Sequence, residues 1–142
     1  MEVRRNFLCL DVGRVRIGLA MANSVSKLPS PVTTLHNNQE FLEKLRVVIL
    51  ENQITDLVVG LPKGLDGTET EQTTWVRGFF KTLKSSIKLP IHLENEALSS
   101  VRAESELKSI GRDYRKSDVD SLAACFILED YIRNNLGALN VK

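Results

Sequence analysis

The chain has 142 residues, a formal net charge of +1, and 42% hydrophobic and 26% charged residues. This composition is typical of a globular domain and excludes a disordered or fibrous chain. The length suits one core, so we expect a single domain over residues 1–142. The near-neutral charge neither requires nor excludes a nucleic-acid partner, because a local basic face can bind where the total charge does not.

The two cysteines, Cys9 and Cys125, lie among apolar residues. Free buried thiols are the favoured interpretation, with a disulfide or a shared metal as the alternative. Free thiols fit a reducing cytosol. No signal peptide is recognisable, and no apolar run reaches the roughly 18 residues that a membrane span needs, so we expect a cytoplasmic protein without a membrane partner.

Apolar runs open the chain. Residues 7–10 and 17–22 predict two strands joined by a Gly-containing turn over 12–16, and the β-branched stretch 31–37 predicts a third strand. Short connections favour an antiparallel meander of these three strands.

Helical and strand patterns alternate in the rest of the chain. Helices are predicted over 38–53, with Asn38 as a candidate cap, and over 70–86, 98–110 and 117–135; strands are predicted over 56–60 and 90–94. This order predicts an α/β fold with a five-stranded mixed sheet flanked by helices. The first three strands would be antiparallel, and the fourth and fifth parallel.

Three acidic positions lie where strands or helices end. Asp11 closes the first strand, Glu94 or Glu96 follows the fifth, and Asp120 lies near the start of the last helix. If the first, fourth and fifth strands are neighbours, these carboxylates gather at one edge of the sheet, as ligand sites do in open α/β sheets. Clustered carboxylates need a cation, and Mg²⁺ or Mn²⁺ suits hard oxygen ligands.

Each of these acids also has a purely structural interpretation. Asp11 could be a turn residue, although four apolar residues precede it and Gly13 would allow a ligand to approach the backbone. Asp120 could complete a capping box with Ser117. Ala123 and Ala124 would let the last helix lie close to the sheet, which a shared site requires.

Four segments resemble the YqgF family, also called RuvX. They are "LDVGRVRIGLAMAN", "LVVGLPKGLDGTE", "LENEALSSVRAE" and "KSDVDSLAACFILEDYI", and they occur in the family's order over almost the whole chain. The resemblance implies a ribonuclease H-like fold and a nuclease that processes precursor 16S rRNA.

The same resemblance implies that Asp11, Glu96 and Asp120 bind the metal and carry catalysis. Two positions depart from the family pattern: Asn95 stands in place of an aspartate and Ala97 in place of an arginine. We expect the neutral Asn95 oxygen to hold a divalent cation less tightly than a carboxylate does. These departures bear on the strength of catalysis more than on the fold.

Five basic residues are candidates for phosphate binding, and the resemblance supports Arg16 among them. They are Arg14, Arg16, Lys63, Arg115 and Lys116. Arg16 could instead be solvated or cap the core, and Lys116 could be merely solvated. The loop 63–69 is either a mobile flap beside the substrate or a structural loop, and Trp75 is favoured as a core residue over a base-stacking platform.

The favoured function is therefore an endonuclease, dependent on Mg²⁺ or Mn²⁺, that acts on precursor rRNA and could associate with the ribosome. The first alternative is a Holliday-junction resolvase acting on branched DNA, which would need a stable dimer for two symmetric cuts. The second is a catalytically weak nucleic-acid-binding protein of ribosome biogenesis. Nucleotide binding of the actin-like kind is disfavoured because it needs two lobes. A monomer or weak dimer is expected, since no dimer seam is recognisable in the sequence.

Overall fold

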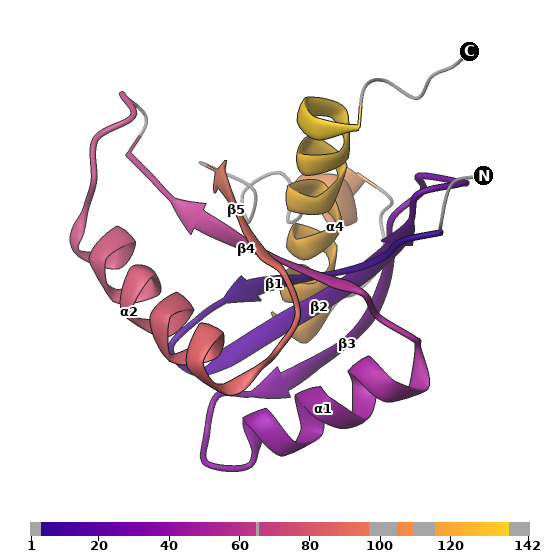
Figure 1. Ribbon diagram of the computed structural model, residues 1–142. Helices are drawn as coiled ribbons and strands as arrows, with labels where there is room; N and C mark the ends of the chain where they lie inside the picture. Colours follow the sequence, from indigo (N-terminus) through magenta and orange to yellow (C-terminus); the bar gives the residue numbers. More distant parts are fainter. Residues whose placement is uncertain (1–3, 65, 97–104, 110–115, 137–142) are drawn as a thin grey trace.

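The computed structural model describes residues 4–64, 66–96, 105–109 and 116–136 (Figure 1). The strands are β1 (Asn6–Val12), β2 (Arg16–Asn23), β3 (Ser30–His36), β4 (Asp56–Pro62) and β5 (Ile91–Glu96). The helices are α1 (Phe41–Glu51), α2 (Glu71–Ser86) and α4 (Lys116–Asn135), and residues 105–109 are also helical.

The strands form one sheet in the order β3-β2-β1-β4-β5. β1 pairs antiparallel with β2, and β2 pairs antiparallel with β3, whereas β4 runs parallel to both β1 and β5. The predicted mixed sheet is thus confirmed. The carboxyl ends of β1, β4 and β5 meet at one edge, which we term the carboxyl edge.

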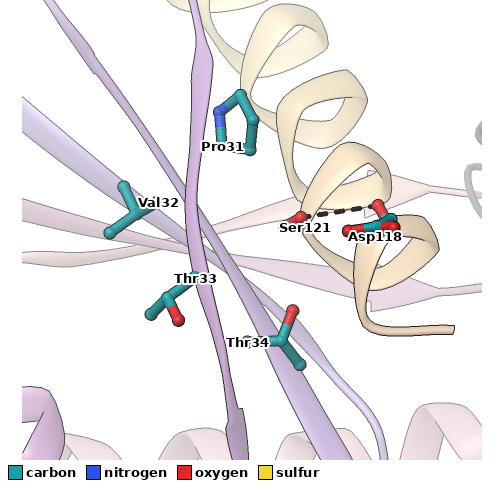
Figure 2. A pocket seen from close by; sticks show the side chains of 6 residues that line it. All are labelled: Pro31, Val32, Thr33, Thr34, Asp118 and Ser121. Atoms are coloured by element: carbon teal, nitrogen blue, oxygen red, sulfur yellow. Dashed lines mark hydrogen bonds between the residues drawn. The ribbon is translucent and has the colours of Figure 1, made fainter. Parts of the chain in front are cut away.

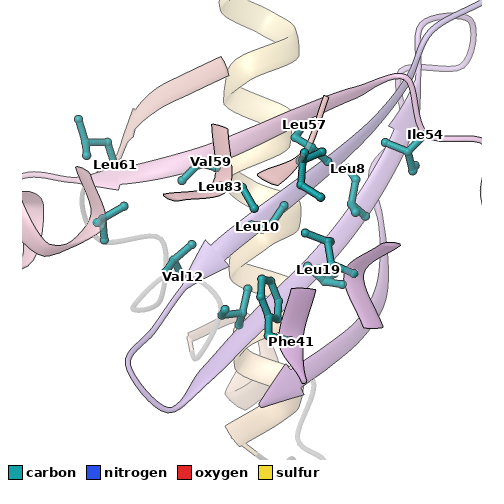
Figure 3. Close-up of a cluster of buried hydrophobic side chains, with 14 residues drawn as sticks. Leu8, Leu10, Val12, Leu19, Phe41, Ile54, Leu57, Val59, Leu61 and Leu83 are labelled. Atoms are coloured by element: carbon teal, nitrogen blue, oxygen red, sulfur yellow. The ribbon is translucent and has the colours of Figure 1, made fainter. Parts of the chain in front are cut away.

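Helices cover both faces of the sheet, α1 and α2 on one side and α4 on the other (Figure 1). In β1, Leu8 and Leu10 join the cluster under α1 and α2 (Figure 3), and Phe7 and Cys9 join the cluster under α4. Strands buried on both faces have continuous apolar sequences. The alternation of side chains continues to Asp11, which therefore faces α4.

Helix α4 lies unusually close to the sheet at one point. A Cβ added at Gly18 of β2 would lie 2.1 Å from the backbone carbonyl oxygen of Asp120. Ala123 and Ala124, on the next turn, are fully buried. The predicted close approach of this helix is confirmed, and the absence of a side chain at Gly18 is what permits it.

Helix boundaries differ from the predicted ones mainly at α1. The helix begins at Phe41, and Asn38 is not its N-cap; the Asn38 side chain instead accepts a hydrogen bond from the Glu40 backbone N–H at 3.0 Å. Such a local turn competes with the first helical turn. For α2, Thr70 caps the helix by accepting from the Thr73 N–H. Of the predicted helix 98–110, the structure describes residues 105–109 only.

Both cysteines are free and buried, as predicted. Burial raises the pKa of the Cys9 thiol well above its usual value and raises that of Cys125 to about 11. None of the helices described is both long and apolar enough to span a bilayer.

The contact at Gly18 leads to a test with a matched control. Gly18→Ala places a methyl group against the α4 backbone, which cannot yield like a flexible side chain, so we expect a loss of roughly 1–3 kcal/mol or more in unfolding free energy. Gly78 is a helical position with nothing within 4 Å of the added Cβ, so Gly78→Ala should raise the free energy of unfolding by roughly 0.5–1 kcal/mol. Urea unfolding of both variants measures the difference. Equal stability of the two would show that α4 can move away from β2 at no cost.

Candidate active site

Asp11 and Asp120 come together at the carboxyl edge. Asp11 pairs with Gly18 across the β1–β2 ladder, and the backbone of Asp120 lies directly on Gly18. Two acids far apart in the sequence thus share one side of the sheet. The tight hairpin after Asp11 explains Gly13 as well: an added Cβ there would lie 2.7 Å from the Arg16 carbonyl oxygen, so this glycine serves the turn.

The pKa of Asp11 is raised to about 7, first because burial disfavours the charged form and second because the negative charge of Asp120 repels it. A carboxyl group in this state gains from a nearby cation. Asp11 is therefore no ordinary turn residue, since a turn aspartate is solvated or hydrogen-bonded to its own loop.

Arg16 supplies the one positive charge that contacts this pair among the residues the structure describes. Its Nε donates to Oδ2 of Asp120 at 2.7 Å. Both side chains are partly exposed, at 31% for Arg16 and 20% for Asp120. The capping-box interpretation of Asp120 is wrong, because α4 begins at Lys116 and places Asp120 in its second turn, with its carboxylate on Arg16.

Glu94 and Glu96 both face α4, but they differ in what surrounds them. Glu94 is 8% exposed, and its Oε2 accepts from Nδ2 of Asn134 at 2.8 Å. Burial, helped by the charge of Asp130, raises the pKa of Glu94. Glu96 is partly exposed at the last position of β5, opposite Pro62. Glu94 is thus engaged with the far half of α4, and Glu96 lies at the carboxyl edge with Asp11.

The acidic side chains near the carboxyl edge meet part of what a hard cation such as Mg²⁺ requires. Within the described residues no group of three His, Cys, Asp or Glu side chains converges as a metal site. Asp11 and Asp120 form a pair of carboxylates, with Glu96 on the same face two strands away. Mg²⁺ commonly uses one or two carboxylates and completes its shell with water and substrate phosphate. The pair is sufficient for that mode of binding.

Asn95 lies on the other face of β5. It pairs with Leu61, which belongs to the core under α1 and α2. Its amide therefore points away from the side of the sheet that carries Asp11. The expectation that Asn95 weakens metal binding assumed that it shares this site, and the strand register argues against it. Ala97 lies outside the described residues.

The candidate basic residues separate into different environments. Lys63 Nζ lies 3.5 Å from Oε2 of Glu69, which also pairs with Arg77. The Arg14 guanidinium lies over the Trp75 indole, 4.8 Å from the ring centroid. Arg115 lies outside the described residues, as does the side chain of Lys116.

The loop after β4 is held by local hydrogen bonds. The Gly64 N–H donates to the Thr68 carbonyl at 2.8 Å, and Oδ1 of Asp66 accepts from both the backbone and the hydroxyl of Thr68. Glu69 ties the end of the loop to Lys63 and Arg77. These bonds favour the structural alternative over a mobile flap.

Comparison with known proteins identifies the family. The family described as "RuvX: Holliday junction resolvase" matches residues 5–134. The chain belongs to the RuvX family. A relative from Maridesulfovibrio salexigens is 38% identical over 88% of this chain and 96% of its own length. Another from Crocosphaera subtropica is 35% identical over 96% of this chain and 98% of its own length. Both carry the name "Putative pre-16S rRNA nuclease".

A solved structure supports the fold of this RuvX chain. Thermus thermophilus RuvC in complex with a Holliday junction superposes with a TM-score of 0.52 at 11% identity, covering 93% of this chain and 96% of RuvC. At that identity the likeness shows the fold alone. The predicted ribonuclease H-like architecture is confirmed.

A polar groove of about 340 Å³ runs between β3 and α4 of the RuvX chain, beside the Asp120 segment (Figure 2). Thr34 and Ser121 bring hydroxyl groups to it, Asp118 borders it, and the Thr33 side chain is turned to the other side of β3. Asp118 is exposed and lies on a different side of α4 from Asp120. Neither Asp11 nor Asp120 is among its lining residues.

A second polar cluster, at the opposite edge of the sheet, was not recognisable in the sequence. Asp56 accepts from Arg5 at 2.9 Å and lies 3.0 Å from Nε2 of His92. Burial alone would raise the pKa of Asp56, but hydrogen bonds from Arg5, His92 and Thr55 outweigh it and lower the pKa. This cluster ties β1 to β4 and β5, and it plays a structural part. Only the strand order brings its members together.

The raised pKa of Asp11 predicts how the stability of the metal-free RuvX chain depends on pH. Because the pKa of Asp11 is about 7 in the folded chain and ordinary in the unfolded one, the neutral carboxyl is favoured by folding. Its contribution to the free energy of unfolding is present at acidic pH and lost as pH rises through about 7. Melting temperatures in EDTA, from about pH 5 to about pH 8, should fall more steeply for the wild type than for Asp11→Asn.

Asp118→Asn is the control, because it removes an exposed acid from the same helix as Asp120. It should keep the wild-type pH dependence. Parallel curves for the wild type and Asp11→Asn would mean that Asp11 is charged at neutral pH without a cation.

Proposed function

We propose that this RuvX-family chain is a divalent-metal-dependent nuclease that hydrolyses phosphodiester bonds in precursor 16S rRNA, in the maturation of the 5′ end. The observation that carries the proposal is the pair Asp11 and Asp120 at the carboxyl edge, one half-buried with a raised pKa and the other beside an arginine. The name of the relatives supports the RNA substrate.

In this proposal Asp11 and Asp120 hold Mg²⁺ or Mn²⁺, and Glu96, two strands away on the same face, approaches as a third ligand when the cation and substrate bind. When bound, such a cation supplies activation of the attacking water and stabilisation of the leaving oxygen. The raised pKa of Asp11 means that its ionised form is disfavoured in the metal-free chain, so a bound cation stabilises that form. Glu96 is preferred to Glu94 because Glu94 is buried against Asn134.

Arg16 holds the carboxylate of Asp120 in place through its Nε. Within the described residues its Nη groups make no hydrogen bond, so they are available to a phosphate oxygen of the substrate. A guanidinium can serve both partners because its donors point in different directions. Arg16 would thus link the carboxylate pair to the scissile phosphate.

A Holliday-junction resolvase is the second candidate, and the description of the matching family favours it. Two symmetric cuts would require two copies of the site in a stable dimer. We favour the rRNA nuclease acting as a monomer or weak dimer, in contact with the immature ribosome. The two free buried cysteines fit the reducing cytoplasm in which ribosomes are assembled.

Cleavage of two labelled substrates tests the proposal. A precursor rRNA fragment should be cut in the presence of Mg²⁺ or Mn²⁺ and left intact in EDTA, while a four-way DNA junction should be cut far more slowly. Asp11→Asn should lose at least about 100-fold in rate, because an amide oxygen holds the divalent cation less tightly than a carboxylate does. Preferred cleavage of the junction would establish the resolvase, and unchanged turnover by Asp11→Asn would refute the assignment of Asp11.

The two glutamates of β5 provide a second, internal test. Glu96→Gln should abolish cleavage because an amide oxygen is a weaker ligand than a carboxylate, whereas Glu94→Gln should retain most activity because a glutamine can still accept from Asn134. Initial rates at saturating Mn²⁺ compare them, and Asn95→Asp, on the opposite face, should leave the metal requirement unchanged. An inactive Glu94→Gln beside an active Glu96→Gln would reverse the assignment.

A further inference from the structure

Among the described residues, most cations near the carboxyl edge already have an acidic partner within the chain. Arg16 pairs with Asp120, and Lys63 and Arg77 both pair with Glu69. In the part of the chain that the structure describes, Arg14 contacts no carboxylate; its guanidinium lies on Trp75. Arg14 is also exposed. It therefore retains its full charge for a ligand.

Trp75 is held firmly beneath this arginine. Its ring packs against Phe79, one helical turn along α2, with centroids 6.3 Å apart, and Phe79 packs against Phe41 at 5.8 Å. Phe41 is 3% exposed and belongs to the core under α1 and α2. A column of aromatic rings thus leads from the core to the guanidinium at the surface.

A guanidinium held over an aromatic ring by the ring's quadrupole still presents its fork of N–H donors to other acceptors. That fork matches two oxygens of a phosphate, and the ring limits the freedom that binding must remove. Lysine, with a flexible chain and a compact charge, would gain much less from the ring. The stacked pair is therefore a preorganised anion contact.

The position of the pair suits a nucleic-acid strand that passes the active site. Arg14 lies in the hairpin turn three residues after Asp11, so their Cα atoms are at most about 10 Å apart, roughly three nucleotide steps of a stacked strand. Asp11 faces α4, whereas Arg14 is turned toward α2. A strand crossing the carboxyl edge would meet both.

We propose that the stacked Arg14–Trp75 pair is the anchor for a backbone phosphate of the RNA strand, a few nucleotides from the bond that Asp11 and Asp120 attack. Arg14 binds the phosphate, and Trp75 is a positioning residue that acts through Arg14. The inference rests on the proposed nuclease function for the identity of the strand. It adds a second point of contact outside the carboxylate pair.

Binding of a fluorescently labelled single-stranded RNA in EDTA, where no metal-dependent cleavage occurs, tests the anchor. Arg14→Gln should weaken binding roughly tenfold, and Trp75→Leu roughly twofold to fivefold. In the Arg14→Gln background, Trp75→Leu should have no further effect, because the two residues act as one unit. Arg14→Lys should resemble Trp75→Leu, since it keeps the charge and loses the stacking.

Arg46→Gln is the matched control, since it removes one exposed arginine that lies on α1 and donates to the carbonyl of Ser86. It should bind RNA within about twofold of the wild type, whereas Arg14→Gln should also lower the logarithmic salt slope by about 0.7 to 0.9. Trp75 is the single tryptophan of the chain, so its emission should change when RNA binds and remain constant in Arg14→Gln. Trp75→Phe keeps a ring at this site and should bind almost as well as the wild type; if Trp75→Leu does not fold, the comparison of Arg14→Lys with the wild type carries the test of the ring contact.

Two results would overturn the anchor: wild-type affinity in Arg14→Gln, or an equal effect of Trp75→Leu with and without Arg14. In either case cleavage of precursor rRNA by the wild type would leave the proposed nuclease function intact. Conversely, coupled loss of RNA binding in the variants, without cleavage of any substrate by the wild type in Mn²⁺, would support the anchor and refute the nuclease.

Discussion

The contact between the α4 backbone and Gly18 is the constraint on which the candidate active site depends. Because Gly18 pairs with Asp11 in the β1–β2 ladder, a helix that touches Gly18 also brings its own side chains to Asp11. The second turn of α4 makes this contact and carries Asp120. Any side chain at Gly18 would push the helix outward and separate the acids. Backbone packing, and not an attraction between two like charges, holds the carboxylates together.

The fold therefore keeps an unfavourable electrostatic arrangement in place. Asp11 is half-buried beside a second negative charge, its partial burial and that charge raise its pKa to about 7, and Arg16 pairs with Asp120. Such a cost is typical of sites that gain their stabilisation when a ligand binds. The polar cluster of Arg5, Asp56 and His92 contrasts with it, because the carboxylate of Asp56 is paired with Arg5 and hydrogen-bonded to His92, and no ligand is needed.

The distribution of charge also explains how a nearly neutral chain could contact a polyanion. The net charge is +1, and the basic residues at the carboxyl edge are largely matched by acids from the same chain. A general electrostatic attraction would then be weak, and specific contacts would decide the affinity. Arg14 differs from its neighbours in that an aromatic ring, and not a carboxylate, holds it. The ring orients the guanidinium without consuming its charge.

The sequence by itself determined the order and type of the elements, the coverage of both sheet faces, and the placement of Asp11 at a strand end, because these follow from periodicities of two and 3.6 residues within short segments. Its motifs also identified the family. Only the tertiary structure decided that Glu94 is engaged by Asn134, that Asn95 faces away from Asp11, and that Arg14 lies on Trp75. Those relations join residues distant in the chain. They depend on strand register and on where each helix crosses the sheet, which local patterns do not encode.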